Sequence, residues 1–262
     1  MTRASRTDAL AIDPRRIEEA GLNAMQTQRQ LFYDGWLLRL SAGKAKRARS
    51  VNAHFGSTLP LARKIGHCER IYAQQELAPL FRITPFDQPA DLEAALAARG
   101  YHAFDETLVQ AVRFERAPDI PDAPDEVGIA ALGVDAFVET VGDLRGSTAT
   151  QREAHRERLL HSPLEKRGVT VAVSGRVVCA AQVAIEGELV GVFDVTTADD
   201  ARGRGYATLA CASLLSWAWQ HGANVAYFQV NADTAPAVAI YRKFGFVTVY
   251  TYHYRGPQGR CE

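Results

Sequence analysis

The stretch DARGRGYATLACASLLSWAWQHG, Asp200–Gly222, constrains the fold more than any other part of the chain. Its second part, from Tyr206 to His221, has small and apolar residues at helical spacing, which predicts an amphipathic helix with one face on a sheet. The predicted buried stripe is Ala207, Ala210, Cys211, Leu214, Leu215 and Ala218. Two glycines, Gly203 and Gly205, come directly before this helix. The sequence therefore predicts a strand, a glycine turn and a helix start.

A helix start of this kind is suited to binding phosphate. The first N–H groups of a helix have no helical acceptor, and the helix dipole adds partial positive charge there. Glycine allows positive φ and lets a ligand approach the backbone, and Arg202 and Arg204 add full charge. The sequence thus predicts a phosphate cradle. Two other interpretations stay open, a flexible turn and a dinucleotide site, although Thr208 stands where the latter needs a third glycine.

The elements around this helix follow a regular order. Two helices are expected at 134–144 and 150–160, and then three antiparallel strands that turn at Ser174-Gly175 and Glu186-Gly187. A strand, NVAYFQV, follows the long helix. The chain then continues as a short helix that Thr234 or Asp233 caps and Gly245 ends, and as a last strand, FVTVYTYHYR.

A proline-rich segment, ERAPDIPDAPDE at 115–126, separates this part from an earlier one. Its three prolines prevent a regular element, so it predicts a linker. The earlier part predicts paired strands at GWLLRLS and RSVNAHF, a helix with Leu61, Ile65, Cys68 and Tyr72 on one face, and then strand, helix and strand. Both parts end on a strand, an Ala-rich helix, a glycine and a strand, which indicates a duplicated domain.

At this point the sequence resembles a known family. Arg202-Gly203-Arg204-Gly205-Tyr206-Ala207 matches the (Q/R)-x-x-G-x-(G/A) motif of the GNAT superfamily of acyl-CoA-dependent N-acyltransferases. The neighbouring segments match in order and spacing from Glu126 to Arg255. The resemblance implies an α/β (α+β) fold of two GNAT-like domains, with mixed, mostly antiparallel sheets flanked by helices. The implied division is 1–116 for a degenerate N-terminal domain, 117–125 for the linker and 126–262 for the acetyltransferase domain.

The resemblance also implies a site for acetyl-CoA as co-substrate, with no metal. The backbone of the last strand residues before the glycine loop would bind the pantetheine arm, and the amides of the loop would bind the pyrophosphate. The implied cofactor-binding residues are Val195, Thr196, Thr197, Arg202, Gly203, Arg204, Gly205, Tyr206, Ala207, Thr208 and Thr234.

Catalysis would rest on two further residues. By resemblance, Tyr241 is the general acid toward the CoA sulfur. Two positions depart from the family, because Thr234 replaces an asparagine and Gln229 replaces a glutamate that serves as base in some members. Asp194 is the remaining candidate base, and burial in an apolar strand would raise its pKa. A structural aspartate, and deprotonation by water, are the alternatives.

The function that these residues predict is an N-acetyltransferase that moves an acetyl group from acetyl-CoA to a primary amine in a ternary complex. The alternative is a catalytically impaired acyl-CoA-binding module, which Thr234 and Gln229 favour. Within enzymes, a nucleotide-dependent oxidoreductase is the second choice. No motif identifies the acceptor. The N-terminal half keeps its apolar elements but has no phosphate loop, so we expect it to wall the acceptor cleft near Trp36, Arg39 and the RARSVN strand.

Composition narrows the partners and the location. Lys and Arg number 30, as do Asp and Glu, so the formal net charge is zero. This balance argues against nucleic-acid and membrane-surface binding; a homodimer stays open. The basic run GKAKRARS, Gly43–Ser50, is expected to be a solvated hairpin tip. The cysteines are scattered, with Cys179 and Cys211 as small core residues, and the N-terminus has no long apolar run. The expected location is the cytoplasm.

Overall fold

Strands from both halves of the chain build one sheet in the computed structural model, which describes residues 12–41, 43, 45–234 and 241–259. The elements of the first half are α1 (Pro14–Ala24), β1 (Gln30–Tyr33), β2 (Trp36–Arg39), the 3-10 helix η2 (Lys46–Ala48), β3 (Val51–Asn52), α2 (Leu61–Gln74), β4 (Phe81–Ile83), α3 (Leu92–Ala98) and β5 (Tyr101–Arg113). Those of the second half are β6 (Val127–Leu132), α4 (Val134–Arg145), α5 (Ala149–His161), β7 (Glu165–Val173), β8 (Arg176–Glu186), β9 (Leu189–Thr197), η3 (Asp199–Ala201), α6 (Tyr206–Gln220), β10 (Val225–Asn231) and β11 (Val247–Pro257).

The two halves exchange strands within this sheet. The strand order is β1-β2-β3-β4-β11-β5-β10-β9-β8-β7-β6. The last strand of the chain, β11, therefore lies between β4 and β5 of the first half, and β5 lies beside β10 of the second half. Two pairs are parallel, β3 with β4 and β9 with β10, and the others are antiparallel. The predicted mixed, mostly antiparallel class is confirmed.

Local sequence accounts for the second-half elements. The predicted turns of the β7–β8–β9 meander are confirmed, since Ser174, Gly175 and Gly187 all have positive φ at the strand ends. Segment 114–126 has no helix or strand, as its prolines predict.

The predicted buried stripe of α6 is largely confirmed. Five of its six positions are buried, and Ala207 is partly exposed. Cys179 and Cys211 are fully buried, as expected of core residues.

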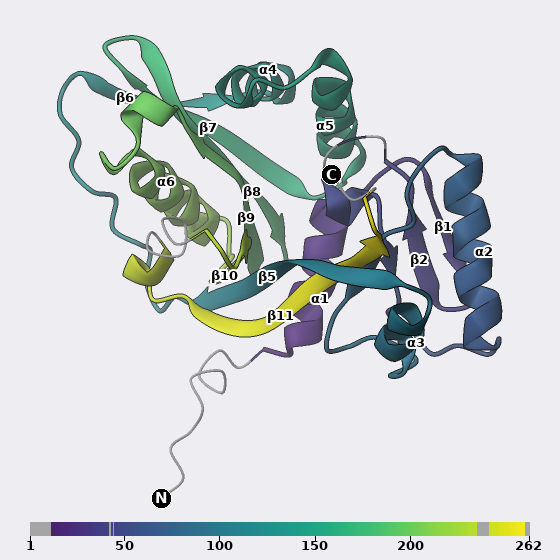
Figure 1. Ribbon diagram of the computed structural model, residues 1–262. Coiled ribbons are helices and arrows are strands. Elements are labelled where there is room, and N and C mark those ends of the chain that lie inside the picture. The colour runs from purple at the N-terminus through teal and green to yellow at the C-terminus, as the bar shows by residue number, and fades with distance from the viewer. Residues whose placement is uncertain (1–11, 42, 44, 235–240, 260–262) are drawn as a thin grey trace, which may run out of the picture.

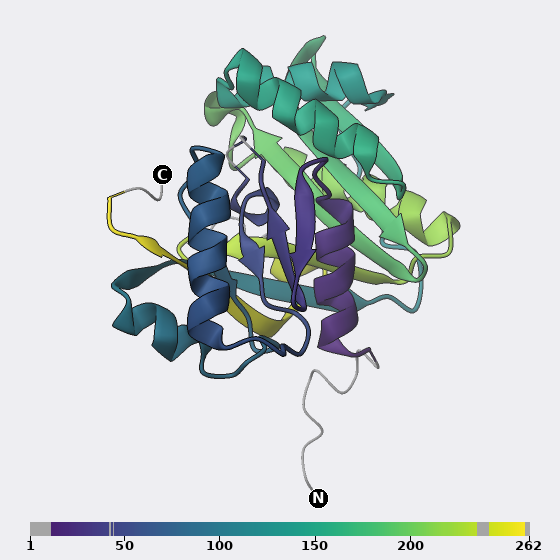
Figure 2. The same cartoon turned by 90° about the vertical axis from the view of Figure 1, so that its right-hand side faces the viewer.

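Helices cover both faces of the sheet. The buried face of α6 packs on β7, β8, β9 and β10, while α1, α4 and α5 lie on the other face (Figure 1). In the first half, α1 and α2 lie on opposite sides of strands β1 to β3 (Figure 2). Ile65, Cys68 and Tyr72 of α2 are buried in the same core cluster as Trp36, and Leu61 packs against that cluster partly buried, which confirms the predicted helical face. Apolar burial on each face stabilises the sheet from both sides.

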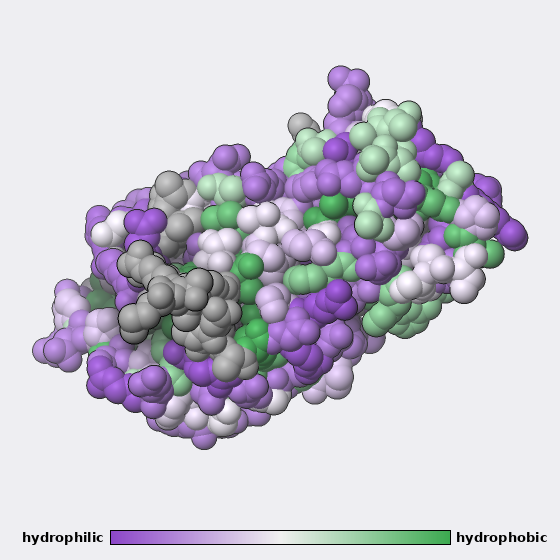
Figure 3. Space-filling view, turned by 90° about the horizontal axis from the view of Figure 1, so that it is seen from below, coloured by the Kyte–Doolittle hydropathy of each residue, from purple (hydrophilic) through white to green (hydrophobic). Residues whose placement is uncertain are grey.

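The outer surface is mixed in polarity. Seen from below, hydrophilic and hydrophobic residues share the face, and the most hydrophobic ones form small groups (Figure 3). Among the described residues, no helix combines the length and the apolar character that crossing a membrane requires.

Candidate functional site

The candidate site begins where β9 and β10 separate. The two strands pair in parallel from Leu189 with Val225 to Val192 with Phe228, and the pairing ends there. Beyond this point β10 continues beside β5, and β9 continues beside β8. Residues 193–197 of β9 and 229–231 of β10 therefore face a gap, and their backbone groups on that side have no ladder partner in the sheet.

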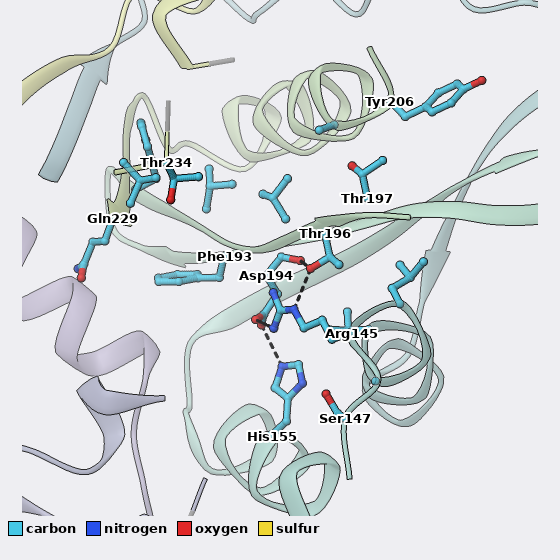
Figure 4. Close-up of a pocket in the computed structure, with 18 of the residues that line it drawn as sticks. Arg145, Ser147, His155, Phe193, Asp194, Thr196, Thr197, Tyr206, Gln229 and Thr234 are labelled. Carbon is cyan, nitrogen blue, oxygen red and sulfur yellow. Dashed lines mark hydrogen bonds and ion pairs between the residues drawn. The ribbon is translucent and has the colours of Figure 1, made fainter. Parts of the chain in front are cut away.

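A β-bulge shapes the β9 side of this gap. The β8–β9 register shifts between Ala180 and Gln182, so that Asp194 and Val195 together oppose one residue of β8. Asp194 has φ +53, a left-handed conformation that aspartate adopts more readily than most residues. The bulge bends β9 away from β10 and directs the Asp194 carboxylate toward α4 and α5 (Figure 4).

Asp194 is held by side chains from three elements. Arg145 Nη1, at the end of α4, donates to Oδ1 over 2.8 Å, and His155 Nε2 of α5 lies 2.9 Å from Oδ2. Gln182 on β8 also donates to Oδ2. Arg145 Nε binds the Thr196 hydroxyl over 2.9 Å, so the arginine bridges two positions of β9.

These partners decide the charge of Asp194. Burial raises its pKa, but the hydrogen bond from His155 and the charges of Arg145 and Arg158 outweigh burial and hold the pKa well below its usual value. The expected rise in pKa is therefore wrong, because the sequence pattern showed the apolar strand but not the cations that fold against it. Asp194 is an ionised, hydrogen-bonded anchor at neutral pH.

The glycine loop lies at the other end of the same gap. Gly203 and Gly205 have φ +77 and +87, which only glycine adopts without strain, and nothing lies within 4 Å of a Cβ built at either residue. Gly205 is the N-cap of α6 and offers no side-chain cap to the free N–H groups of the first turn. Arg202 forms an ion pair with Asp199 over 2.6 Å. This geometry is that of an anion cradle.

One cleft of about 1100 Å³ joins the loop to the gap. The predicted cofactor residues that line it are Val195, Thr196, Thr197, Arg202, Gly203, Gly205, Tyr206, Ala207, Thr208 and Thr234. Arg204 is exposed and is not part of this lining. The helix start that Thr234 was expected to cap concerns residues 235–240, which lie outside the described residues. Asp194 and Tyr241 line the same cleft, so folding brings the predicted site residues together, apart from Arg204.

Tyr241 lies on the α6 face of the sheet. Its ring stacks on Phe228 with centroids 3.4 Å apart and also contacts Phe246. Burial, followed by the neighbouring Cys211 thiol, raises the pKa of Tyr241 well above its ordinary value. Its hydroxyl therefore keeps its proton at neutral pH.

The first half also reaches the cleft. Met25, Ala45 and Arg47 line it. Arg47 Nη1 donates to Gln229 Oε1 over 2.5 Å, and Lys46 forms an ion pair with Asp105, so the expected solvated tip is wrong. The loop does join the antiparallel strands β2 and β3, but it folds back as η2 against residues that the linear sequence does not bring near.

Trp36 and Arg39 lie elsewhere than expected. The Trp36 indole is buried in the first-half core and donates to the Gln88 carbonyl. The Arg39 guanidinium donates to the carbonyls of Leu22 and Met25 at the end of α1. Neither residue lines the cleft, because all four residues of β2 are buried, with Trp36 packed in the core on the α2 side and Arg39 bonded to α1 on the other.

Arg145, His155 and Arg158 are among the polar residues of the cleft that the sequence interpretation missed. Two of them lie on the buried face of α5, which consists of Ala154, His155, Arg158 and Leu159. A helix that presents a histidine and an arginine where apolar residues are expected is the signal that was available.

Comparison with known proteins places this architecture in a family. The family model described as "Probable histone acetyltransferase Rv0428c C-terminal" matches residues 12–255. The chain belongs to this family. It is also 25% identical, over 260 residues, to an uncharacterized N-acetyltransferase, YobR, of Bacillus subtilis (strain 168), covering 93% of this chain and 98% of that protein.

Solved structures agree in fold. A GCN5-related N-acetyltransferase from Kribbella flavida superposes with a TM-score of 0.68 at 17% identity, covering 97% of this chain and 96% of that one. A tandem GNAT protein from the clavulanic acid biosynthesis pathway gives a TM-score of 0.61 at 15% identity, covering 74% of this chain and 68% of that one. Together the comparisons confirm the GNAT superfamily and the N-acetyltransferase class.

Proposed function

We propose that this N-acetyltransferase takes its acetyl group from acetyl-CoA and transfers it to a primary amine by direct attack in a ternary complex. One observation carries the proposal. A single cleft connects the N-terminus of α6, with its two positive-φ glycines, to the gap between β9 and β10. The first is suited to a pyrophosphate, and the second to an extended chain that bonds to free backbone groups.

The residues present fit this co-substrate. The loop backbone from Gly203 to Thr208 would bind the pyrophosphate, since added Cβ atoms at the glycines would enter the open space of the cradle. Arg202 and Arg204 add positive charge beside it. The free edge of β9 at 195–197 would pair with the pantetheine amides.

Tyr241 and His155 are the proposed proton donor and acceptor. As the amine nitrogen bonds to the thioester carbon, the carbon–sulfur bond breaks, and the thiolate takes a proton from the Tyr241 hydroxyl. The amine loses a proton to the His155 imidazole, directly or through water. Asp194, ionised and fixed by Arg145, holds the imidazole ring, so it is a positioning residue and not the base.

An impaired acyl-CoA-binding module is the competing function. Gln229 favours it, because its carbonyl accepts hydrogen bonds from Arg47 and from the Tyr252 hydroxyl and it supplies no base. The complete glycine loop and the cleft position of Tyr241 favour the enzyme. The division at 117–125, the cytoplasmic location and a homodimer stay predictions.

Two measurements test the proposal. Calorimetry with acetyl-CoA should show at least roughly 100-fold weaker binding for Gly205→Val, since valine strains the positive φ and fills the cradle. Gly56→Val is the matched control, because Gly56 precedes α2 in the first half, also has open space around its Cβ position and has no positive φ. Equal affinity of the Gly205 variant and the native protein would rule out the cradle.

A turnover assay distinguishes an active acetyltransferase from an impaired acyl-CoA-binding module. Release of free thiol from acetyl-CoA is followed across a panel of amines. We expect thiol release with at least one amine, and Tyr241→Phe to lower kcat by roughly 100-fold while acetyl-CoA affinity is kept. A native protein that binds acetyl-CoA and releases no thiol with any amine would instead be the module.

A further inference from the structure

The cleft gathers positive charge that the chain as a whole does not have. The formal net charge of the protein is zero. The cleft lining nevertheless contains six cationic side chains and two carboxylates. The cations are Arg47, Arg145, Arg152, Arg158, Arg202 and Lys243, and the carboxylates are Asp194 and Asp199. Such a surplus attracts anions into the cleft.

Part of this charge has internal partners or lies at the phosphate end. Arg145 pairs with Asp194, Arg152 pairs with Glu139 and Asp143, and Arg202 at the glycine loop pairs with Asp199. Lys243 is exposed to solvent. Within the described part of the chain, Arg47 and Arg158 form no ion pair with a carboxylate.

Arg158 is a buried cation, and its guanidinium has a hydrogen-bond donor without a partner among the described residues. The residue is only 8% exposed, yet it lines the cleft. Its Nη1 donates to the Ala154 carbonyl of its own helix, and its Nε has no hydrogen-bond partner among the described residues. Burial lowers the pKa of Arg158, the Asp194 carboxylate raises it, and the Arg47 charge lowers it again. Because a buried guanidinium that forms no direct ion pair is costly, a bound anion would compensate the charges of Arg158 and Arg47.

Arg47 lies at the mouth of the gap. Its guanidinium binds Gln229 and lies over the Phe193 ring, 5.9 Å from the centroid. Phe193 and Gln229 are the first residues after β9 and β10 stop pairing. Phe193 packs in the cluster on the α1 face, whereas Tyr241 packs in the cluster on the α6 face. Arg47 therefore approaches the gap from the face opposite the glycine loop.

We propose that Arg47 and Arg158 bind an anionic oxyacid group, a carboxylate or a phosphate, on the acceptor. The acceptor class is then a small amine that carries an acid group, such as an amino acid, and not a lysine-rich peptide. This inference rests on the proposed acetyl transfer and leaves its chemistry unchanged. The acid group is bound and does not react, and the paired guanidinium forks hold it so that the amine points into the gap.

The test compares matched acceptors in the thiol-release assay. L-amino acids are compared with their uncharged amides, aminoalkyl phosphates with the corresponding amino alcohols, and both sets with a lysine-rich peptide. We expect an acid-bearing amine to be preferred. The amino acids and their amides test for a carboxylate, and the aminoalkyl phosphates and amino alcohols test for a phosphate. Arg47→Gln and Arg158→Gln should each raise KM for the preferred acceptor roughly 10- to 100-fold and leave its neutral analogue unchanged. Arg116→Gln, at an exposed ion pair with Asp119, is the control.

Two readouts without turnover complete the test. Acetyl-CoA affinity by calorimetry should be unchanged in both variants, which separates acceptor binding from the glycine loop. The acid-bearing amine should bind to CoA-saturated native protein and lose that binding in both variants, even if no amine releases thiol and the proposed transfer fails.

Stability gives the last readout. Arg158→Gln should unfold at the same temperature as the native protein or higher, because it removes a buried guanidinium that forms no direct ion pair. Three results would each overturn the inference. They are a preference for the amides, the amino alcohols or the peptide, an unchanged KM in both arginine variants, and a large drop in the unfolding temperature of Arg158→Gln.

Discussion

The loops ahead of α2 and α6 differ in what lies against their backbone: a carboxylate of the protein ahead of α2, and open space ahead of α6. Each helix connects two parallel strands, β3 to β4 and β9 to β10. Ahead of α2, the Asp34 carboxylate accepts hydrogen bonds from the amides of Thr58 and Leu59 over 2.9 Å each. Ahead of α6, Gly203 and Gly205 keep the equivalent space open. The first half thus binds the loop amides ahead of its helix with its own carboxylate, whereas the second half leaves the space ahead of α6 open.

Two half-buried aspartates, one in each half, differ in the charge of their partners. Asp87 in the first half accepts hydrogen bonds from the Thr84 amide and hydroxyl, which are neutral. Burial outweighs these bonds and raises the pKa of Asp87 to about 7. Asp194 has cationic partners, and its pKa is lowered. Asp87 thus holds a local turn of the first half through neutral partners, whereas Asp194 stands among cations that line the cleft.

Cutting the chain between the halves gives the largest expected effect. In residues 122–262 alone, β10 and β11 lose β5, which separates them in the sheet, and β11 also loses β4. Two strands would then have unpaired edges, so we expect no cooperative unfolding transition by circular dichroism, in contrast to the full chain. A soluble fragment that binds acetyl-CoA would show that the second half is independent of the first.

Breaking a buried ion pair of the first half ranks second. Arg82 donates to Glu18 over 2.9 Å, and the Tyr250 hydroxyl of β11 donates to the same carboxylate. Arg82→Ala leaves Glu18 buried without its counterion and should lower the free energy of unfolding by about 3–5 kcal/mol in urea titrations. Arg176→Ala, which removes an exposed pair with Asp200, should cost less than about 1 kcal/mol. Similar losses in both variants would contradict the structural role of the first-half pair.

The smallest effect is a pH dependence from Asp87. Its folded pKa lies above that of an unfolded aspartate, so folding takes up a proton there and is favoured as pH falls from about 7 toward 4. Asp87→Asn should remove this gain in stability at lower pH, because asparagine takes up no proton. When the pH falls from 7.5 to 5.5, the unfolding temperature of the native protein should gain roughly 3 °C relative to that of the Asp87→Asn variant. Parallel pH profiles would show that Asp87 titrates normally.

Much of the second half was predictable, because its signals are local. The α6 stripe, the turns of the β7–β8–β9 meander and the glycine loop each depend on residues close in sequence. The match of Arg202–Ala207 to a family motif then predicted the fold class and the enzyme class, which the comparisons confirm. The charge state of Asp194 was not predictable, since its partners lie 12 to 49 residues away.

By itself, therefore, the sequence determined the second-half elements up to β10 and the open glycine loop, but not α1 or β1, since periodicity and the conformational freedom of glycine act within a few residues. Only the tertiary structure decided that β11 crosses into the first half, that His155 and Arg145 meet at Asp194, and that Arg47 reaches the gap beside Gln229. These contacts join distant segments, and their energies depend on burial and on charges from other elements, which exist only once the sheet has formed.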